Sequence, residues 1–168
     1  MITPWDYEGA EQVAEGAGEV VDAINRLRAL EGGRVVFAND LKEGFHGSRE
    51  KSFELALAGR FPELVGPLEP KSDEDFIHKG QHSAFYGTPL AHLLDLHDAD
   101  EVVLAGQVTE QCVLYSALDA HVRGYDVTLA TDAVLAQQEH LGNAALEMMR
   151  ENMGAKLVTS GELVSQLA

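Results

Sequence analysis

Apolar residues recur at intervals of three and four positions in the first part of the chain, from Ala10 to Leu30. This spacing gathers them on one side of a helix, and the pair Gly32–Gly33 closes that helix. A β-branched run follows at 34–38 and predicts a buried strand, because a strand covered on both faces need not alternate apolar with polar residues. The chain is thus predicted to open with a helix and then a strand.

The same alternation continues along the rest of the chain. Residues 62–70 are predicted to be loop, and Thr88 and Pro89 are residue types that begin helices. The other segments predict strands at 76–78, 101–106, 125–130 and 156–158, and helices at 48–59, 109–122, 137–153 and 161–167. Strands joined through helices form right-handed crossovers and a parallel sheet covered on both faces. We therefore predict an α/β fold, a three-layer αβα sandwich, with residues 1–168 in a single domain.

The composition narrows the classes of partner. Asp and Glu number 28 against 12 Lys and Arg, for a formal charge of −16. Such a surface repels nucleic-acid phosphates and anionic membranes, so neither is expected as a partner. No apolar run reaches the roughly 18–20 residues of a membrane span. The first residues, MITPWDYEG, lack the basic and apolar regions of a signal peptide, so we expect a cytoplasmic protein.

The chain contains one cysteine, Cys112, which excludes an internal disulfide and any Cys-x-x-Cys motif. It follows the strand predicted at 101–106, and Thr109 is suited to cap the helix that comes next. Cys112 would then lie in the first turn of that helix, at the sheet edge where reactive groups gather. Free N–H groups there stabilise a thiolate and can hold an oxyanion. Cys112 is therefore a candidate nucleophile, and the alternative is a small buried core residue.

Two segments resemble the motifs of isochorismatase-like cysteine hydrolases. The sequence AGQVTEQCV at 105–113 resembles their G-V-x-T-x-x-C-V motif, and KGQHSAFYGTPL at 79–90 resembles K-x-x-x-S-A-F-x-G-T-x-L. Residues 124–127 and 131–133 also fit the family pattern. The resemblance extends over nearly the whole chain, and it implies a Rossmann-type fold with a six-stranded parallel sheet.

For catalysis, this resemblance implies a triad of cysteine, lysine and aspartate. Cys112 would attack a carbonyl carbon, while Lys79 stabilises the thiolate or orients the acid. The carboxylate would pass the proton to the leaving amine, and water would then hydrolyse the acyl-thioester. A cis peptide bond before the cysteine, here between Gln107 and Val108, would aim the N–H groups of Val108 and Cys112 at the oxyanion. The resemblance implies no cofactor.

Three residues near the lysine, His82, Phe85 and Tyr86, are candidates for the wall of a substrate pocket. Core packing or a surface position is the alternative for each of them. Metal-dependent relatives such as nicotinamidases carry an Asp-x-His pair after the second strand, whereas residues 39–42 of this chain read Asn-Asp-Leu-Lys. Without that histidine we expect no metal. Gly16 and Gly18 follow no strand and lack a third glycine, which excludes a dinucleotide fingerprint.

The chain departs from the family pattern at its start. The catalytic aspartate of the family ends an N-terminal strand, and Met1 occupies the position directly after that aspartate. Asp6 corresponds to a second, non-catalytic aspartate of the motif. We therefore expect the first strand and its aspartate to be encoded upstream of Met1. The alternatives for filling the gap in the sheet are an extended Met1–Tyr7 segment, a partner chain or a rearranged sheet.

These observations favour a metal-independent hydrolase that cleaves a C–N bond of a small amide, ureide or carbamoyl substrate. Vinyl-ether hydrolysis of isochorismate is a second interpretation, which Cys112 disfavours because that reaction needs a general acid more than a thiol. A third is a catalytically idle family member that acts as a binding or scaffold subunit. Because members of the family commonly assemble, we also expect a homo-oligomer.

Overall fold

The computed structural model describes residues 1–41 and 47–167, and it confirms the predicted alternation of helices and strands. The strands are β1 (Val36–Asp40), β2 (Asp75–Lys79), β3 (Glu101–Gln107), β4 (Asp126–Leu135) and β5 (Lys156–Val158). The helices are α1 (Ala10–Ala14), α2 (Ala17–Arg28), α3 (Arg49–Leu57), α4 (Pro62–Val65), α5 (Leu90–Leu96), α6 (Leu114–Val122), α7 (Glu139–Met153) and α8 (Ser160–Leu167). Two short turns complete them, the 3₁₀ turn η1 (Gly66–Leu68) and the π-helical turn η2 (Thr109–Val113).

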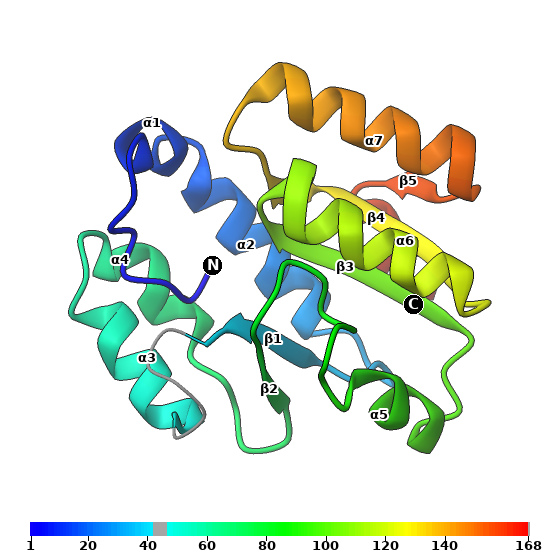
Figure 1. Cartoon of the computed structure of the whole chain (residues 1–168), viewed down its shortest axis with the longest axis horizontal. Coiled ribbons are helices and arrows are strands. Elements are labelled where there is room, and N and C mark those ends of the chain that lie inside the picture. Colours follow the sequence, from blue (N-terminus) through cyan, green and yellow to red (C-terminus); the bar gives the residue numbers. More distant parts are fainter. Residues whose placement is uncertain (42–46, 168) are drawn as a thin grey trace.

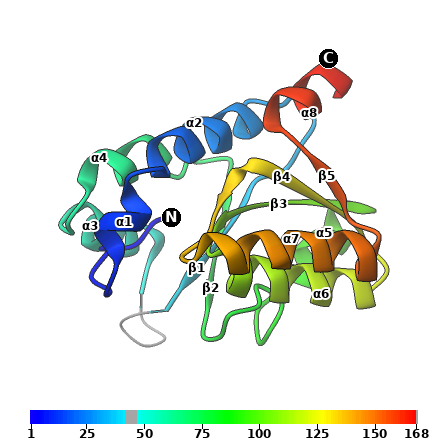
Figure 2. The ribbon, with the colours of Figure 1, turned by 90° about the horizontal axis from the view of Figure 1, so that it is seen from above.

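The elements form three layers (Figures 1 and 2). Figure 2 shows α2 and α8 on one side of the strands and α5, α6 and α7 on the other, with α1, α3 and α4 gathered at one end. The described strand pairs are all parallel, as expected when a helix connects successive strands. The αβα architecture predicted from the sequence is thus confirmed.

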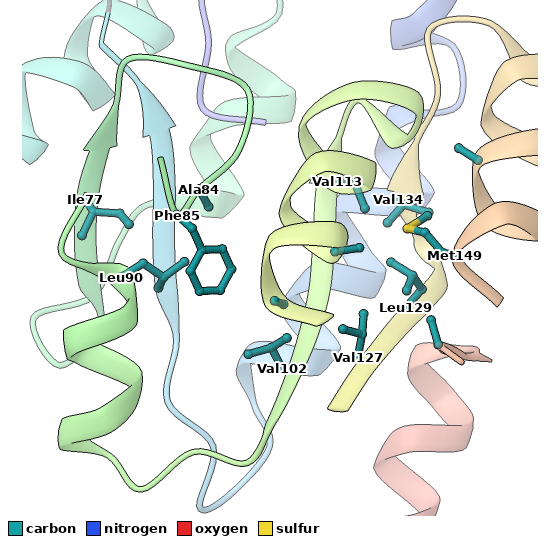
Figure 3. Packing of buried hydrophobic residues seen from close by; sticks show 14 residues of the cluster. Ile77, Ala84, Phe85, Leu90, Val102, Val113, Val127, Leu129, Val134 and Met149 are labelled. Carbon is teal, nitrogen blue, oxygen red and sulfur yellow. The ribbon is translucent and has the colours of Figure 1, made fainter. Parts of the chain in front are cut away.

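The strands do not form the single six-stranded sheet that the family resemblance implied. Among the described residues, β1 pairs with β2 in one sheet, and β3, β4 and β5 form a second sheet in that order. Figure 3 shows the two sheets next to each other, with β1 and β3 as the facing strands. The six-stranded prediction is wrong for the described part of the chain. No described segment pairs with both β1 and β3, and Met1–Tyr7 forms no strand.

Element boundaries differ from the prediction for local reasons. The helix predicted from Ala10 to Leu30 is divided into α1 and α2 near Gly16, in keeping with the low helix propensity of glycine. Pro62 begins α4 inside a segment predicted as loop, since its fixed φ suits the first turn of a helix. Strand β4 is ten residues long and continues past the predicted end at 130.

Three buried clusters hold the layers together, and the smallest packs Ala23 of α2 and Leu163 of α8 against β4. Of the two larger clusters, one surrounds the strands and includes Phe85 and Leu129 (Figure 3). The other packs the N-terminal segment against α1 to α4, with Trp5 fully buried. The carbonyl oxygen of Pro4 accepts a hydrogen bond from the Arg60 N–H at 3.0 Å, which anchors that segment. No helix in the described part of the chain is long and apolar enough to cross a membrane.

Candidate active site

The carboxyl ends of three strands bring together residues from distant parts of the sequence. Asp40, Lys79 and Gln107 are the last residues of β1, β2 and β3. The parallel register pairs Asp40 with Lys79, and β3 leads into η2, which carries Cys112. Parallel strands all end at the same edge of the sheet, so side chains at their ends collect there.

Lys79 contacts both the thiol and a carboxylate. Its side chain is only 6% exposed, and its Nζ atom lies 3.4 Å from the Sγ atom of Cys112. Nζ also donates hydrogen bonds to Oδ1 of Asp40 at 2.5 Å and to the carbonyl oxygen of Gln81 at 3.2 Å. A buried ammonium requires a compensating anion, and Asp40 provides it.

Cys112 lies half-buried in the π-helical turn η2. A hydrogen bond of 3.2 Å from the Val113 N–H to the Val108 carbonyl oxygen closes this wide turn. Val108 is the N-cap, and Thr109, which the sequence suggested as the cap, is the buried first residue of the turn. The peptide bond between Gln107 and Val108 is cis, at the position where the resemblance implied one. The thiol is therefore near the amino end of a helical segment that continues into α6.

A pocket of about 550 Å³ opens beside the thiol. Its wall includes Asp40, Lys79, His82, Cys112 and the segment Met1–Pro4. Burial lowers the pKa of the Met1 α-amino group to about 6, an effect that Asp40 and Cys112 oppose and that Lys79 reinforces. The carboxylate, the lysine and the thiol thus all act electrostatically on this amino group.

The segment between Lys79 and α5 is fastened to the helix that follows Cys112. Ser83 donates a hydrogen bond to Oδ2 of Asp119 at 2.5 Å, and the Ala84 N–H donates to Oγ of Ser116 at 2.9 Å. Ser116 in turn donates to the carbonyl oxygen of Cys112 at 2.6 Å. These hydrogen bonds hold the segment that follows Lys79 beside Cys112. Ser83 and Ala84 of the upstream motif therefore have a structural role here.

Of the three residues predicted for the pocket wall, the structure brings His82 to the thiol. Its Nδ1 atom lies 3.7 Å from Sγ of Cys112, and His82 lines the pocket. Phe85 is instead a core residue whose ring stacks on Tyr125, since burial removes its apolar surface from water. Tyr86 is 66% exposed and is not among the pocket-lining residues of the described chain. Phe85 and Tyr86 therefore do not line this pocket.

Asp40 is a site residue that the sequence did not predict. The lack of a histidine at 39–42 bears on metal binding and not on the pairing of strands. Lys42, the last residue of that segment, lies outside the described residues. The available signal was that Asp40 and Lys79 each follow a predicted strand, and neighbouring strands in a parallel sheet place such residues together. Within residues 1–41 and 47–167, no group of three or more His, Cys, Asp or Glu side chains is placed to hold a metal ion.

Comparison with known sequences identifies the family. The isochorismatase domain model matches residues 2–162. The uncharacterized isochorismatase family protein YaaI of Bacillus subtilis is 24% identical over 171 residues, which covers 99% of this chain and 93% of YaaI. The aligned regions of seven further curated relatives cover only 54–60% of their lengths. One of these, from Arabidopsis thaliana, is named a probable inactive nicotinamidase.

Solved structures with the same fold include a nicotinamidase and an amidase. The nicotinamidase PncA of Bacillus subtilis matches with a TM-score of 0.64 and 26% identity, over 90% of this chain and 86% of that one. The N-carbamoylsarcosine amidase of Thermoplasma acidophilum matches with a TM-score of 0.68 and 25% identity, over 87% and 85% of the two chains. Because the family model matches nearly all of the sequence, this chain belongs to the isochorismatase family.

Proposed function

We propose that this protein hydrolyses a C–N bond of a small amide, ureide or carbamoyl compound through an acyl-thioester on Cys112, without a metal ion. The observation that carries the proposal is the 3.4 Å contact between Nζ of Lys79 and Sγ of Cys112 at the wall of a pocket. An ammonium at this distance favours the thiolate, which is the nucleophilic form of cysteine.

In this reaction Cys112 is the nucleophile and Lys79 stabilises its thiolate. Attack on the carbonyl carbon forms a C–S bond and places negative charge on the carbonyl oxygen. We assign two N–H groups as donors to that oxygen, those of Val108, which is the N-cap of η2, and of Cys112, which lies within η2. Loss of the amine leaves a thioester, and its hydrolysis by water restores the thiol.

Two further observations support a small amide-type substrate. The names of two structural neighbours, a nicotinamidase and an amidase, denote amide hydrolysis. The pocket volume of about 550 Å³ falls within the range of small-molecule sites. His82, at 3.7 Å from Sγ, is the pocket residue that we expect to contact the substrate beside the thiol.

Two other functions make different predictions for Cys112. Vinyl-ether hydrolysis of isochorismate would rely on a general acid and would form no bond to the thiol. An idle family member would bind a small molecule without turnover, and the name of the Arabidopsis relative gives that alternative a precedent. Of the three, amide hydrolysis alone passes through a covalent intermediate on Cys112.

Intact-mass measurement after mixing with nicotinamide, N-carbamoylsarcosine and a panel of ureides tests the proposal. The expected result is a mass increase equal to one acyl group, located at Cys112 by peptide mapping, together with release of ammonia or an amine. Cys112→Ser is the control and should form no thioester. Isochorismate turnover without a mass increase would favour the vinyl-ether reaction, and binding without adduct or turnover would favour the idle protein.

We also propose that the chain forms a homo-oligomer. Three apolar side chains of α6, those of Tyr115, Leu118 and Val122, are 44%, 47% and 66% exposed. Their spacing places them on one face of the helix, as in an interface. Size-exclusion chromatography with light scattering tests this, and a mass near 18.2 kDa at micromolar concentrations would contradict it.

A further inference from the structure

A single side chain joins the turn that carries Cys112 to the start of helix α7. Glu110 is the second residue of η2 and lies two positions before Cys112. Its Oε1 atom accepts hydrogen bonds from the Gln137 N–H at 3.0 Å and from the Gln138 N–H at 2.8 Å. Gln138 is the N-cap of α7, a helix of 15 residues. Glu110 therefore ties the nucleophile's turn to the first residues of a long helix.

The charge of Glu110 suits this position. The N–H groups at the amino end of a helix carry partial positive charge, so a carboxylate placed there is stabilised. The side chain of Gln138 makes no capping hydrogen bond to α7. The carboxylate of Glu110 thus serves the start of α7 from a segment that is 27 residues away from Gln137 in the sequence.

The second oxygen of the same carboxylate is placed at a cost. Oε2 of Glu110 is buried and has no hydrogen-bond partner within the described part of the chain. A buried acceptor without a partner destabilises a fold. A shorter or apolar side chain would avoid this cost, but it would lose both hydrogen bonds of Oε1. The two bonds to the start of α7 are therefore what the carboxylate contributes here.

Close packing reinforces the contact between η2 and α7. Helix α7 packs against η2 and lies beside α6 in both views (Figures 1 and 2). A Cβ atom on Gly142, in the first turn of α7, would lie 2.4 Å from Cβ of Ala136 and 3.8 Å from Cβ of Thr109, the first residue of η2. The glycine thus lets α7 approach the turn closely, and a shift at the start of α7 would move the turn.

The turn determines where the thiol and the oxyanion donors point. The N–H groups assigned as donors belong to Val108 and Cys112, and the hydrogen bond of 3.2 Å from the Val113 N–H to the Val108 carbonyl oxygen closes the segment between them. Gln137, whose N–H binds Glu110, lines the same pocket as Cys112. Glu110 therefore holds the nucleophile and its donors against one wall of the pocket.

We propose that Glu110 is a positioning residue, whose carboxylate fixes the Cys112 turn on the start of α7 and so aligns Sγ and the oxyanion donors with a bound carbonyl group. The inference rests on the part of the proposed function in which Cys112 attacks a carbonyl carbon. In this role Glu110 touches no reacting atom and transfers no proton. Its loss should slow attack on a carbonyl group without making the thiol itself less reactive.

Two reagents separate alignment from thiol reactivity. With p-nitrophenyl acetate the thiolate forms a C–S bond, the carbonyl oxygen carries the negative charge, and nitrophenolate leaves as the C–O bond breaks. Alkylation by iodoacetamide displaces iodide and forms no oxyanion. Each rate is taken on its plateau at high pH, where the thiol is fully ionised. Glu110→Ala should slow acylation by about tenfold to 100-fold, and it should change alkylation by less than about threefold.

The conservative variant tests the hydrogen bonds themselves. Glu110→Gln has nearly the same shape and keeps a side-chain oxygen that accepts hydrogen bonds from the Gln137 and Gln138 N–H groups. It should therefore restore most of the acylation rate that Glu110→Ala loses. Glu110→Asp keeps the charge but shortens the reach to α7, so its acylation should be slower than in the wild type. That variant provides the same test if Glu110→Ala does not fold.

The matched control is Glu162, a carboxylate that serves the start of another helix. Its Oε2 atom accepts hydrogen bonds from the N–H of Thr159 at 2.7 Å and from the hydroxyl of Thr159 at 2.9 Å, directly before α8. Figure 2 shows α8 in the layer opposite α6 and α7. Glu162→Ala and Glu110→Ala should each lower the unfolding temperature by about 2–4 °C, as loss of a cap does in a domain of this size. Only Glu110→Ala should lose acylation.

The outcomes are distinct. Wild-type acylation in Glu110→Ala would overturn the proposal, and so would equal losses of acylation and alkylation, or a Glu110→Gln variant as slow as Glu110→Ala. A wild-type protein that iodoacetamide alkylates but p-nitrophenyl acetate does not acylate would overturn it as well. If the ester acylates Cys112 but no amide does, the proposed amide hydrolysis fails, while the ester rates of the Glu110 variants still decide the assignment of Glu110.

Discussion

Nζ of Lys79 lies 3.4 Å from Sγ of Cys112, although 33 residues separate them in the sequence. Lys79 ends β2, and Cys112 follows the end of β3, so both lie at the carboxyl edge of the strands although β2 and β3 belong to different sheets. The hydrogen bonds from Ala84 to Ser116 and from Ser116 to the Cys112 carbonyl connect the two segments. The contact between Lys79 and Cys112 therefore depends on a link between helix and loop rather than on a shared strand ladder.

The first prediction concerns the reactivity of Cys112. Iodoacetamide should modify the thiol in the folded protein below neutral pH, because the Lys79 ammonium favours the thiolate. Cys112→Ser should unfold at nearly the same temperature as the wild type, since the two side chains differ by one atom, and should lose the acyl-enzyme. Labelling that requires a denaturant would identify Cys112 as a core residue instead.

The second prediction concerns Lys79. Lys79→Met keeps most of the buried stem but removes the charge, and it should reduce amide hydrolysis by about 100-fold or more, as loss of an electrostatic stabiliser does. Alkylation of Cys112 should also move to higher pH. Lys156→Met, at a 62% exposed lysine on β5, is the control and should leave both measurements unchanged. Equal alkylation profiles for wild type and Lys79→Met would remove Lys79 from the mechanism.

The third prediction is that chelation leaves the activity unchanged. The Asp40 carboxylate, which lines the same pocket as the thiol, is already hydrogen-bonded to the Lys79 ammonium, and that ammonium repels a cation at the same place. Amide hydrolysis should be the same after dialysis against EDTA and should not rise when zinc or manganese is added. Loss of activity in EDTA that a divalent ion restores would contradict the metal-independent mechanism.

The sequence predicted the residues that belong to short, continuous motifs better than those that depend on packing. Lys79 and Cys112 were found because each lies in a motif at the end of a strand. Phe85 lies in the same motif as Lys79 but packs against Tyr125, and a motif alone does not tell which way an aromatic side chain turns. Asp40 was missed because its partner is set by strand register, a relationship between segments that are far apart in the chain.

The fourth prediction tests how the N-terminal segment closes the pocket. A Cβ atom at Gly59 would lie 2.3 Å from the carbonyl oxygen of Pro4, which itself lines the pocket. Gly59→Ala should therefore displace this segment, raise KM, and destabilise the protein by about 1–3 kcal/mol. Gly66→Ala is the control, because its Cβ would meet only Cδ2 of Leu57 at 4.0 Å. Equal thermal stability of the two variants would contradict the close approach of Gly59 to the Pro4 backbone.

The last prediction concerns a buried ion pair that holds α2 against the segment before β2. Arg28 donates to both carboxylate oxygens of Glu74, at 2.8 Å and 2.7 Å, and the two side chains are 6% and 5% exposed. Glu74→Gln would leave the Arg28 charge buried without its anion. The variant should therefore be less stable by about 3–5 kcal/mol. Glu151→Gln, in the exposed Arg150–Glu151 pair, should change stability far less.

The effect of Glu74 should also depend on pH. Burial by itself would raise the pKa of Glu74, but hydrogen bonds from Arg28 and the Lys71 N–H outweigh it and hold the pKa below its ordinary value of 4.5. The unfolded chain thus takes up the proton first as the pH falls, so the stability from the Glu74 carboxylate is present above pH 4.5 and is lost below it. Urea unfolding of wild type and Glu74→Gln should be measured at neutral pH and at successively lower pH. The difference between their free energies of unfolding should stay constant down to about pH 4.5 and narrow below it. Because the two proteins share every other acidic group, the contributions of those groups cancel in this difference. A difference that stays constant through the acid range would show that Glu74 has no lowered pKa.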